Sequence, residues 1–125
     1  MRTRALSGAI VLAIALVACG APTPQRAVDQ TTRALYEGDR DAAVSSFDEP
    51  LKTEVTRAQV GAISDAMHML GAYKGLQPLE TNTGANGRYD YAATFDRGTM
   101  LVMVRLDPDG RIAAYRVSPQ EQQGS

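Results

Sequence analysis

The stretch TMLVMVRLDPDGRIAAYRV, from Thr99 to Val117, contains the pattern of two strands joined by a tight turn. Its first part, 99–106, is apolar on both faces apart from Arg105, which predicts a strand inside a sheet. The run Asp107-Pro108-Asp109-Gly110 is a strong turn signal, because proline pre-sets φ for a type I turn and glycine accepts the left-handed position. The part 111–117 then completes an antiparallel hairpin.

Two more strands are predicted upstream of this hairpin. In 89–96, aromatic and small apolar residues alternate with polar ones, as expected for a strand with one buried face. The segment 73–82 also has strand character, but Gly75 and Pro78 make it irregular and place it at a sheet edge. The segment 83–87 between them is rich in Gly and Asn, which accept positive φ and favour a turn.

Helical periodicity precedes the strands. The segment 25–37 has a stripe of small and apolar residues and ends at Gly38, a good C-terminal stop. Asp39 is expected to cap a second, shorter helix, and Pro50 suits the first turn of a third segment. The members of the first stripe are Val28, Thr31, Ala34 and Leu35.

The helix over 57–70 is expected to be the longest. Thr56-Arg57-Ala58-Gln59 matches a capping box, in which the first and fourth side chains bond each other's backbone N–H. Val60, Ile63, Met67 and Leu70 then recur at spacings of three and four, which places them on one face.

Helices followed by strands joined by tight turns predict an α+β fold with a four-stranded antiparallel meander sheet. One face of the sheet is expected to pack on the helix over 57–70. The domain is predicted to span 25–117, with a flexible polar tail over 118–125.

The N-terminus has the pattern of a lipoprotein signal peptide over 1–18. Arg2 and Arg4 precede nine apolar residues, AIVLAIALV, a run too short to span a bilayer. Leu16-Val17-Ala18-Cys19 resembles a bacterial lipobox, which predicts lipidation of Cys19 and cleavage before it. The proline-rich segment 19–24 would be a tether between lipid and domain. An ordinary secretory signal or a core cysteine is the alternative.

Cleavage before Cys19 removes 18 of the 125 residues and leaves 107, enough for one domain. Removing Arg2 and Arg4 from 13 basic residues leaves 11 against 14 acidic ones, a formal charge of −3. This balance argues against nucleic-acid binding. We expect an exported protein anchored in the membrane, on the periplasmic face of the outer membrane if the host has two membranes.

Four stretches, together with the order of the elements, carry a resemblance to known proteins. They are Ala43-Val44-Ser45-Ser46-Phe47-Asp48, Leu70-Gly71-Ala72-Tyr73-Lys74, Phe95-Asp96-Arg97-Gly98-Thr99 and Leu106-Asp107-Pro108-Asp109-Gly110-Arg111-Ile112-Ala113-Ala114-Tyr115. The order of the elements resembles the nuclear-transport-factor-2-like or cystatin-like α+β roll. More narrowly, the chain resembles an uncharacterised bacterial lipoprotein domain family that also occurs N-terminal to some α/β-hydrolases. The resemblance covers about 25–117 and implies a roll fold, a lipid anchor and no assigned activity or catalytic residue.

The single histidine, His68, follows Ser64 and Asp65 at helical spacings of four and three. Three such groups on one helix surface offer neither an oxyanion hole nor a substrate cleft, so a triad is disfavoured. A partly exposed helix histidine beside an acid is the simpler interpretation. One histidine and one lipidated cysteine cannot supply a metal site, and we expect no cofactor.

A candidate ligand pocket is suggested by aromatic, methionine and arginine side chains on the strands and the last helix. Tyrosine adds a polar tip to an apolar ring, and methionine adapts to irregular ligands. The alternative is that these side chains fill the core. The candidates are Met67, Tyr89, Tyr91, Phe95, Met100 and Arg105.

We therefore expect a non-enzymatic binding or interaction module. Its partners would be the membrane through Cys19 and either an envelope protein, a small apolar ligand or a second copy in a homodimer. The alternative is a small-molecule enzyme that uses a pocket of the roll with His68 or a tyrosine as acid–base group.

Overall fold

The computed structural model describes residues 24–81 and 84–119. The predicted signal peptide, Cys19, most of the tether and the end of the tail lie outside these residues. Within the described ranges, no helix has the length and hydrophobicity needed to cross a bilayer.

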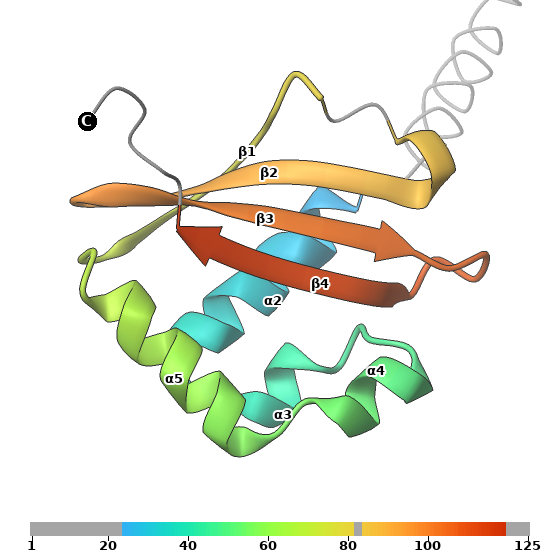
Figure 1. Ribbon diagram of the computed structural model, residues 1–125, viewed down its shortest axis with the longest axis horizontal. Helices are drawn as coiled ribbons and strands as arrows, with labels where there is room; N and C mark the ends of the chain where they lie inside the picture. Colours follow the sequence, from blue (N-terminus) through green and yellow to red (C-terminus); the bar gives the residue numbers. More distant parts are fainter. Residues whose placement is uncertain (1–23, 82–83, 120–125) are drawn as a thin grey trace, which may run out of the picture.

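The described residues have the predicted α+β order of helices followed by strands. The sheet is an antiparallel meander with the strand order β1-β2-β3-β4. In Figure 1 the α-helices lie on one side of the sheet, and no described helix covers its other face. The elements are α2 (Gln25–Glu37), α3 (Arg40–Ala43), α4 (Glu49–Glu54), α5 (Arg57–His68), β1 (Tyr73–Pro78), the 3₁₀ helix η1 (Ala85–Gly87), β2 (Arg88–Phe95), β3 (Gly98–Leu106) and β4 (Ile112–Pro119).

The helix boundaries follow from local capping. The predicted capping box is present: the Thr56 hydroxyl accepts from Gln59 N at 3.1 Å, and Gln59 Oε1 accepts from Thr56 N at 2.8 Å. The Asp39 side chain caps α3, and Gly38 ends α2 with a left-handed φ of 77°. These bonds satisfy backbone groups that a helix end leaves without partners. α2 has the expected bounds, whereas α5 ends at His68, two residues before the expected end. Among the described residues α2, with 13 residues, is therefore longer than α5, with 12, and the expectation that the helix over 57–70 is the longest is wrong.

The strands differ from expectation at two ends. β1 is an edge strand as predicted, but it ends at Pro78 and not at residue 82, with Leu79 N still donating to Asp90 O at 3.1 Å. β4 continues to Pro119, so Ser118 belongs to the sheet and not to the predicted tail, because it pairs with Leu101. The predicted hairpin between β3 and β4 is present, with Gly110 N donating to Asp107 O at 2.9 Å.

The packing of helices on the sheet corrects one expectation. The helix with the closest packing on the sheet is α2, which lies against β1, whereas α5 packs mainly on α2. The reason is the extent of burial on each helix. α2 buries a whole stripe of side chains, threonines included, whereas α5 reaches the shared core mainly with Val60 and Met67. Figure 1 shows α2 crossing beneath the strands, with α5 and α4 further from the sheet.

One hydrophobic core joins the helices to the inner face of the sheet. Burial alternates along β2 and β3, so that one set of side chains faces the helices and the other faces outward. The buried apolar residues are Val28, Ala34, Leu35, Ala43, Val44, Phe47, Val60, Met67, Tyr73, Leu76, Tyr91, Ala93, Phe95, Met100, Val102, Val104 and Ile112.

Candidate functional site

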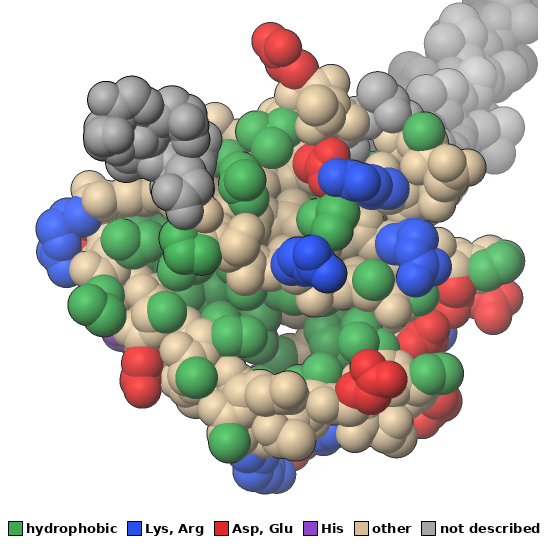
Figure 2. All heavy atoms as spheres, in the orientation of Figure 1, with side chains coloured by type: hydrophobic (Ala, Val, Ile, Leu, Met, Phe, Trp, Pro, Cys, Tyr) green, Lys and Arg blue, Asp and Glu red, His purple; other side chains and the backbone are tan. Residues whose placement is uncertain are grey.

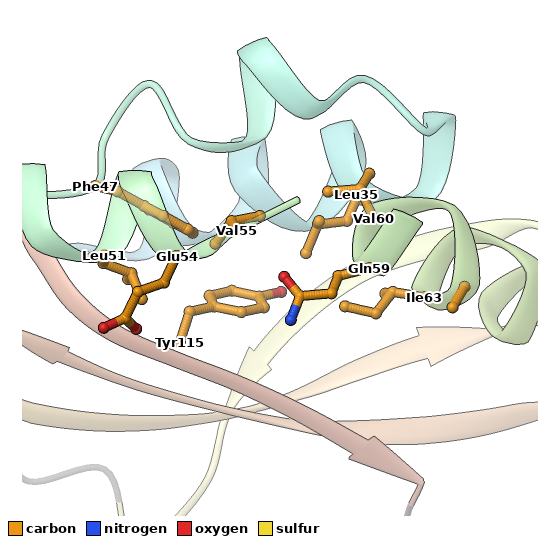
Figure 3. Close-up of a pocket in the computed structure, with 10 residues that line it drawn as sticks. Leu35, Phe47, Leu51, Glu54, Val55, Gln59, Val60, Ile63 and Tyr115 are labelled. Carbon is orange, nitrogen blue, oxygen red and sulfur yellow. The ribbon is translucent and has the colours of Figure 1, made fainter. Parts of the chain in front are cut away.

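A cavity of about 450 Å³ lies between the helical layer and β4. Figure 3 shows the Tyr115 ring at its base, with α4 side chains on one side and α5 side chains on the other. Apart from Glu54 and Gln59, its lining is hydrophobic or aromatic. The lining residues are Leu35, Phe47, Leu51, Glu54, Val55, Gln59, Val60, Ala62, Ile63 and Tyr115.

The cavity exists because α4 and α5 meet at an elbow. Asp48 caps α4 by accepting from Leu51 N at 3.0 Å, and Val55 is extended between the two helices. Because the chain leaves α4 at Val55 and enters α5 through the Thr56 cap, α4 and α5 cannot form one continuous helix. Leu51 and Val55 therefore lie across the opening from Ile63, and all three stay only partly buried.

Arg40 holds this elbow in place. Its Nε donates to Val55 O at 3.1 Å, and its Nη2 donates to Lys52 O at 2.8 Å. A helix leaves its last carbonyl groups without intrahelical partners, and a guanidinium near them offers both hydrogen bonds and a favourable charge. Arg40 is thus a positioning residue for the cavity wall.

The Tyr115 ring forms the base of the cavity and its hydroxyl is anchored in the core. The hydroxyl lies 2.7 Å from Oγ1 of Thr32, a fully buried residue of α2. Burial raises the pKa of the Tyr115 hydroxyl above its ordinary value, and the Thr32 hydrogen bond partly opposes this shift. The ring also lies 6.1 Å from that of Phe47. The Tyr115 hydroxyl at the base is therefore neutral and hydrogen-bonded.

Two exposed polar residues, Glu54 and Gln59, line the cavity. The capping box uses Oε1 of Gln59 and leaves its Nε2 group as a donor. Among the described residues, no cation lies within ion-pair distance of Glu54. The cavity thus combines an apolar interior with one carboxylate and one amide at its rim.

A second hollow of about 460 Å³ adjoins the cavity at strand β4. The two share three lining residues, Leu51, Glu54 and Tyr115. The second hollow also has three arginines in its lining, Arg88, Arg105 and Arg116. Figure 2 shows Lys and Arg side chains gathered over the sheet, above a hollow that hydrophobic side chains border.

The pocket residues nominated from sequence are mostly elsewhere. Met67, Tyr91, Phe95 and Met100 are buried in the core, and none of them lines the cavity or the second hollow. Tyr91, Phe95 and Met100 alternate on the inner face of the sheet, and Met67 reaches the same core from α5. All four are therefore packing residues, the alternative already open from the sequence.

Tyr89 and Arg105 have other positions. Tyr89 is partly buried against the core and lines neither space. Arg105 is exposed on the outward face of β3 and lines the second hollow.

His68 also lies outside the cavity, at the end of α5. Its ring stacks on Tyr36, with centroids 4.0 Å apart, and its Nδ1 lies 2.8 Å from Ser64 O. The Ser64 hydroxyl donates to the Tyr36 carbonyl at 2.8 Å. The ion pairs of the described residues do not include one between His68 and Asp65. This arrangement does not assemble the serine–histidine–aspartate triad that the spacing raised.

The described part of the chain contains no cluster of three or more histidine, cysteine or carboxylate side chains that could hold a metal.

Several functional candidates were not foreseen from sequence, above all Tyr115, Phe47 and Arg40. A local signal did exist: two helix caps, Asp48 and Thr56, lie eight positions apart with apolar residues between and after them. Such spacing predicts a helical elbow, which leaves apolar side chains on both sides of a gap.

No protein-family model matches the chain, and the comparisons with curated proteins and with solved structures find no match.

Proposed function

We propose that this protein is a lipid-anchored protein of the bacterial envelope whose domain binds a small apolar ligand in the cavity between α2, α4, α5 and β4. The anchor rests on the lipobox at 16–19 after a short apolar run. Lipidation at Cys19 would hold the domain at the membrane surface, because several buried acyl chains give stable anchoring.

The observation that carries the binding function is the cavity itself. Its volume of about 450 Å³ falls in the range of ligand-binding cavities, roughly 300–1,000 Å³. Its lining also has the usual composition, mainly apolar with few polar groups that could orient a ligand. Each CH₂ group transferred from water into such a lining would contribute about 0.8 kcal/mol.

The test uses a matched pair of tryptophan variants on α5. Ala62 lines the cavity, so Ala62→Trp should fill it. Ala66 is also exposed on α5 but lines none of the hollows described here, so Ala66→Trp is the control. The full chain would be purified gently from membranes and examined by native mass spectrometry for a reproducible added mass.

We expect the added mass of a bound ligand on the wild-type chain and on Ala66→Trp, and no added mass on Ala62→Trp. In a deletion strain, Ala62→Trp should fail to restore the phenotype that Ala66→Trp restores. A wild-type chain without added mass, together with full complementation by Ala62→Trp, would refute ligand binding. It would turn attention to an envelope protein partner or a homodimer, which cross-linking in intact cells would detect.

A further inference from the structure

The outward face of the sheet brings three arginines together. Arg88 of β2 lies directly opposite Arg105 of β3 in the strand register. Arg105 in turn pairs with Ala114 of β4, so Arg116, two positions further along β4, is its diagonal neighbour. Diagonal neighbours on one face of a sheet are within reach of long side chains. All three arginines are exposed and line the second hollow.

This placement brings like charges close together. Like charges directly opposite each other in a sheet are destabilising. Arg88 is compensated, because its Nε lies 3.3 Å from Asp90. Among the described residues, no carboxylate lies within ion-pair distance of Arg105 or Arg116. Arg105 and Arg116 are therefore the two guanidinium groups of this face that an added anion could neutralise.

The two uncompensated arginines adjoin the apolar cavity. The hollow that they line shares Leu51, Glu54 and Tyr115 with that cavity. Tyr115 pairs with Val104 on the inner face, whereas Arg105 and Arg116 lie on the outward face, so this hollow passes around the edge strand β4. A ligand with its apolar part over Tyr115 would therefore bring its polar end to the guanidinium groups by passing around this edge. Guanidinium groups bind carboxylate and phosphate through paired N–H donors.

We infer that the ligand is a single-chain amphiphile with an anionic head group, a carboxylate or a phosphate, whose alkyl chain occupies the cavity and whose head group binds Arg105 and Arg116. This inference rests on the proposed function of the cavity. It adds the charge of the head group, the part of the ligand that the cavity alone does not specify.

Glu54 is the one group that opposes this assignment. Its carboxylate lines both spaces and would repel an anion or attract an amine. With Arg88 compensated by Asp90, two free guanidinium groups remain against this one carboxylate. The balance of charge favours an anionic head group.

The experiment compares probes that share one alkyl chain and differ in head group. Dodecanoate, dodecyl phosphate, neutral dodecanol and cationic dodecylamine are titrated onto the full lipidated chain in a nonionic detergent. Bound fractions are measured by native mass spectrometry. Dodecanol reports on the cavity alone, so its binding tests the proposed function separately from the head-group preference.

We expect dodecanoate or dodecyl phosphate to bind about tenfold more tightly than dodecanol, as charge-assisted hydrogen bonds would give. The double variant Arg105→Gln/Arg116→Gln should lose this preference and keep dodecanol binding. Arg26→Gln, which removes an exposed arginine of α2 that lines neither space, should change nothing. The ratio between dodecanoate and dodecyl phosphate then distinguishes a fatty-acid ligand from a lysophospholipid-like one.

Two outcomes overturn the inference. Equal binding of dodecanol and the anions, unchanged in the double variant, would exclude the arginines from the site. Tighter binding of dodecylamine would assign the head group to Glu54 instead. Failure of every probe, dodecanol included, would refute the proposed function itself.

Discussion

The hydrogen bond between Thr32 and Tyr115 links the core of α2 to the base of the cavity, and its removal should have a measurable cost. Thr32 Oγ1 lies 2.8 Å from Val28 O, to which it donates, and 2.7 Å from the Tyr115 hydroxyl. Thr32 has a single hydroxyl proton, so Tyr115 donates to Thr32. The two partners therefore have different roles, and their variants should have different effects.

Tyr115→Phe removes one hydrogen bond and leaves no donor without an acceptor. We expect the free energy of unfolding to fall by about 0.5–1.5 kcal/mol. Thr32→Val leaves the buried Tyr115 hydroxyl as a donor without an acceptor, at a cost of about 1–3 kcal/mol. The double variant has no Tyr115 hydroxyl and so no donor without an acceptor. The effects of the two changes on the free energy of unfolding should therefore be non-additive, with a coupling energy of about 1–2 kcal/mol.

Equilibrium urea unfolding of the four forms, followed by circular dichroism, measures this coupling. Tyr36→Phe is the control partner, because the Tyr36 hydroxyl donates to Gly71 O and not to Thr32. Its combination with Thr32→Val should be additive. Coupling below about 0.3 kcal/mol between Thr32 and Tyr115, or a larger cost for Tyr115→Phe than for Thr32→Val, would refute this reasoning.

Four further perturbations follow from the structure. Gly71→Ala should lower the free energy of unfolding by at least ~1–2 kcal/mol, because φ is +95° there and an added Cβ would lie 2.6 Å from Asp96 Cβ; an unchanged urea midpoint would contradict this. The backbone N–H of Ala72 donates to Asp96 and lowers the pKa of this carboxyl from its ordinary 3.8. The stability that the carboxylate contributes is therefore present above about pH 4 and is lost as pH falls through the folded-state pKa. Below about pH 4, the free energy of unfolding of Asp96→Asn should decline less steeply than that of the wild type. Arg40→Gln should weaken dodecanol binding by loosening the elbow between α4 and α5, whereas equal affinity would show that the cavity wall does not depend on it. Cys19→Ser should abolish acyl labelling and release the chain from membranes, and continued tight membrane association would exclude the lipid anchor.

Much of the secondary structure follows from local chemistry that can be read directly from the chain. The capping box at Thr56, the aspartate cap at Asp39 and the turn at 107–110 each satisfy backbone groups through neighbours a few positions away. Such bonds need no distant partner, so the sequence predicts them well. The expected edge position of β1 and the interior position of β3 are both confirmed.

The candidate site was less predictable, because burial is decided between elements. Tyr91 and Met100 are residue types that are common in ligand pockets, but both lie on the inner face of the sheet and are buried in the core. Tyr115 and Leu51 have equally ordinary surroundings in the sequence, yet they line the cavity. Periodicity predicts which side chains share a face, and it does not predict which face another element will cover.

The sequence by itself determined the helix and strand order, the caps and turns, and the prediction of an anchor at Cys19, because each depends on short-range pattern. The tertiary structure alone decided that α2 packs on β1 and that an elbow between α4 and α5 leaves a space over Tyr115. It also decided the strand register that sets Arg88 opposite Arg105. These features depend on how separate elements pack, where a shift of one residue in register moves every side chain to the other face.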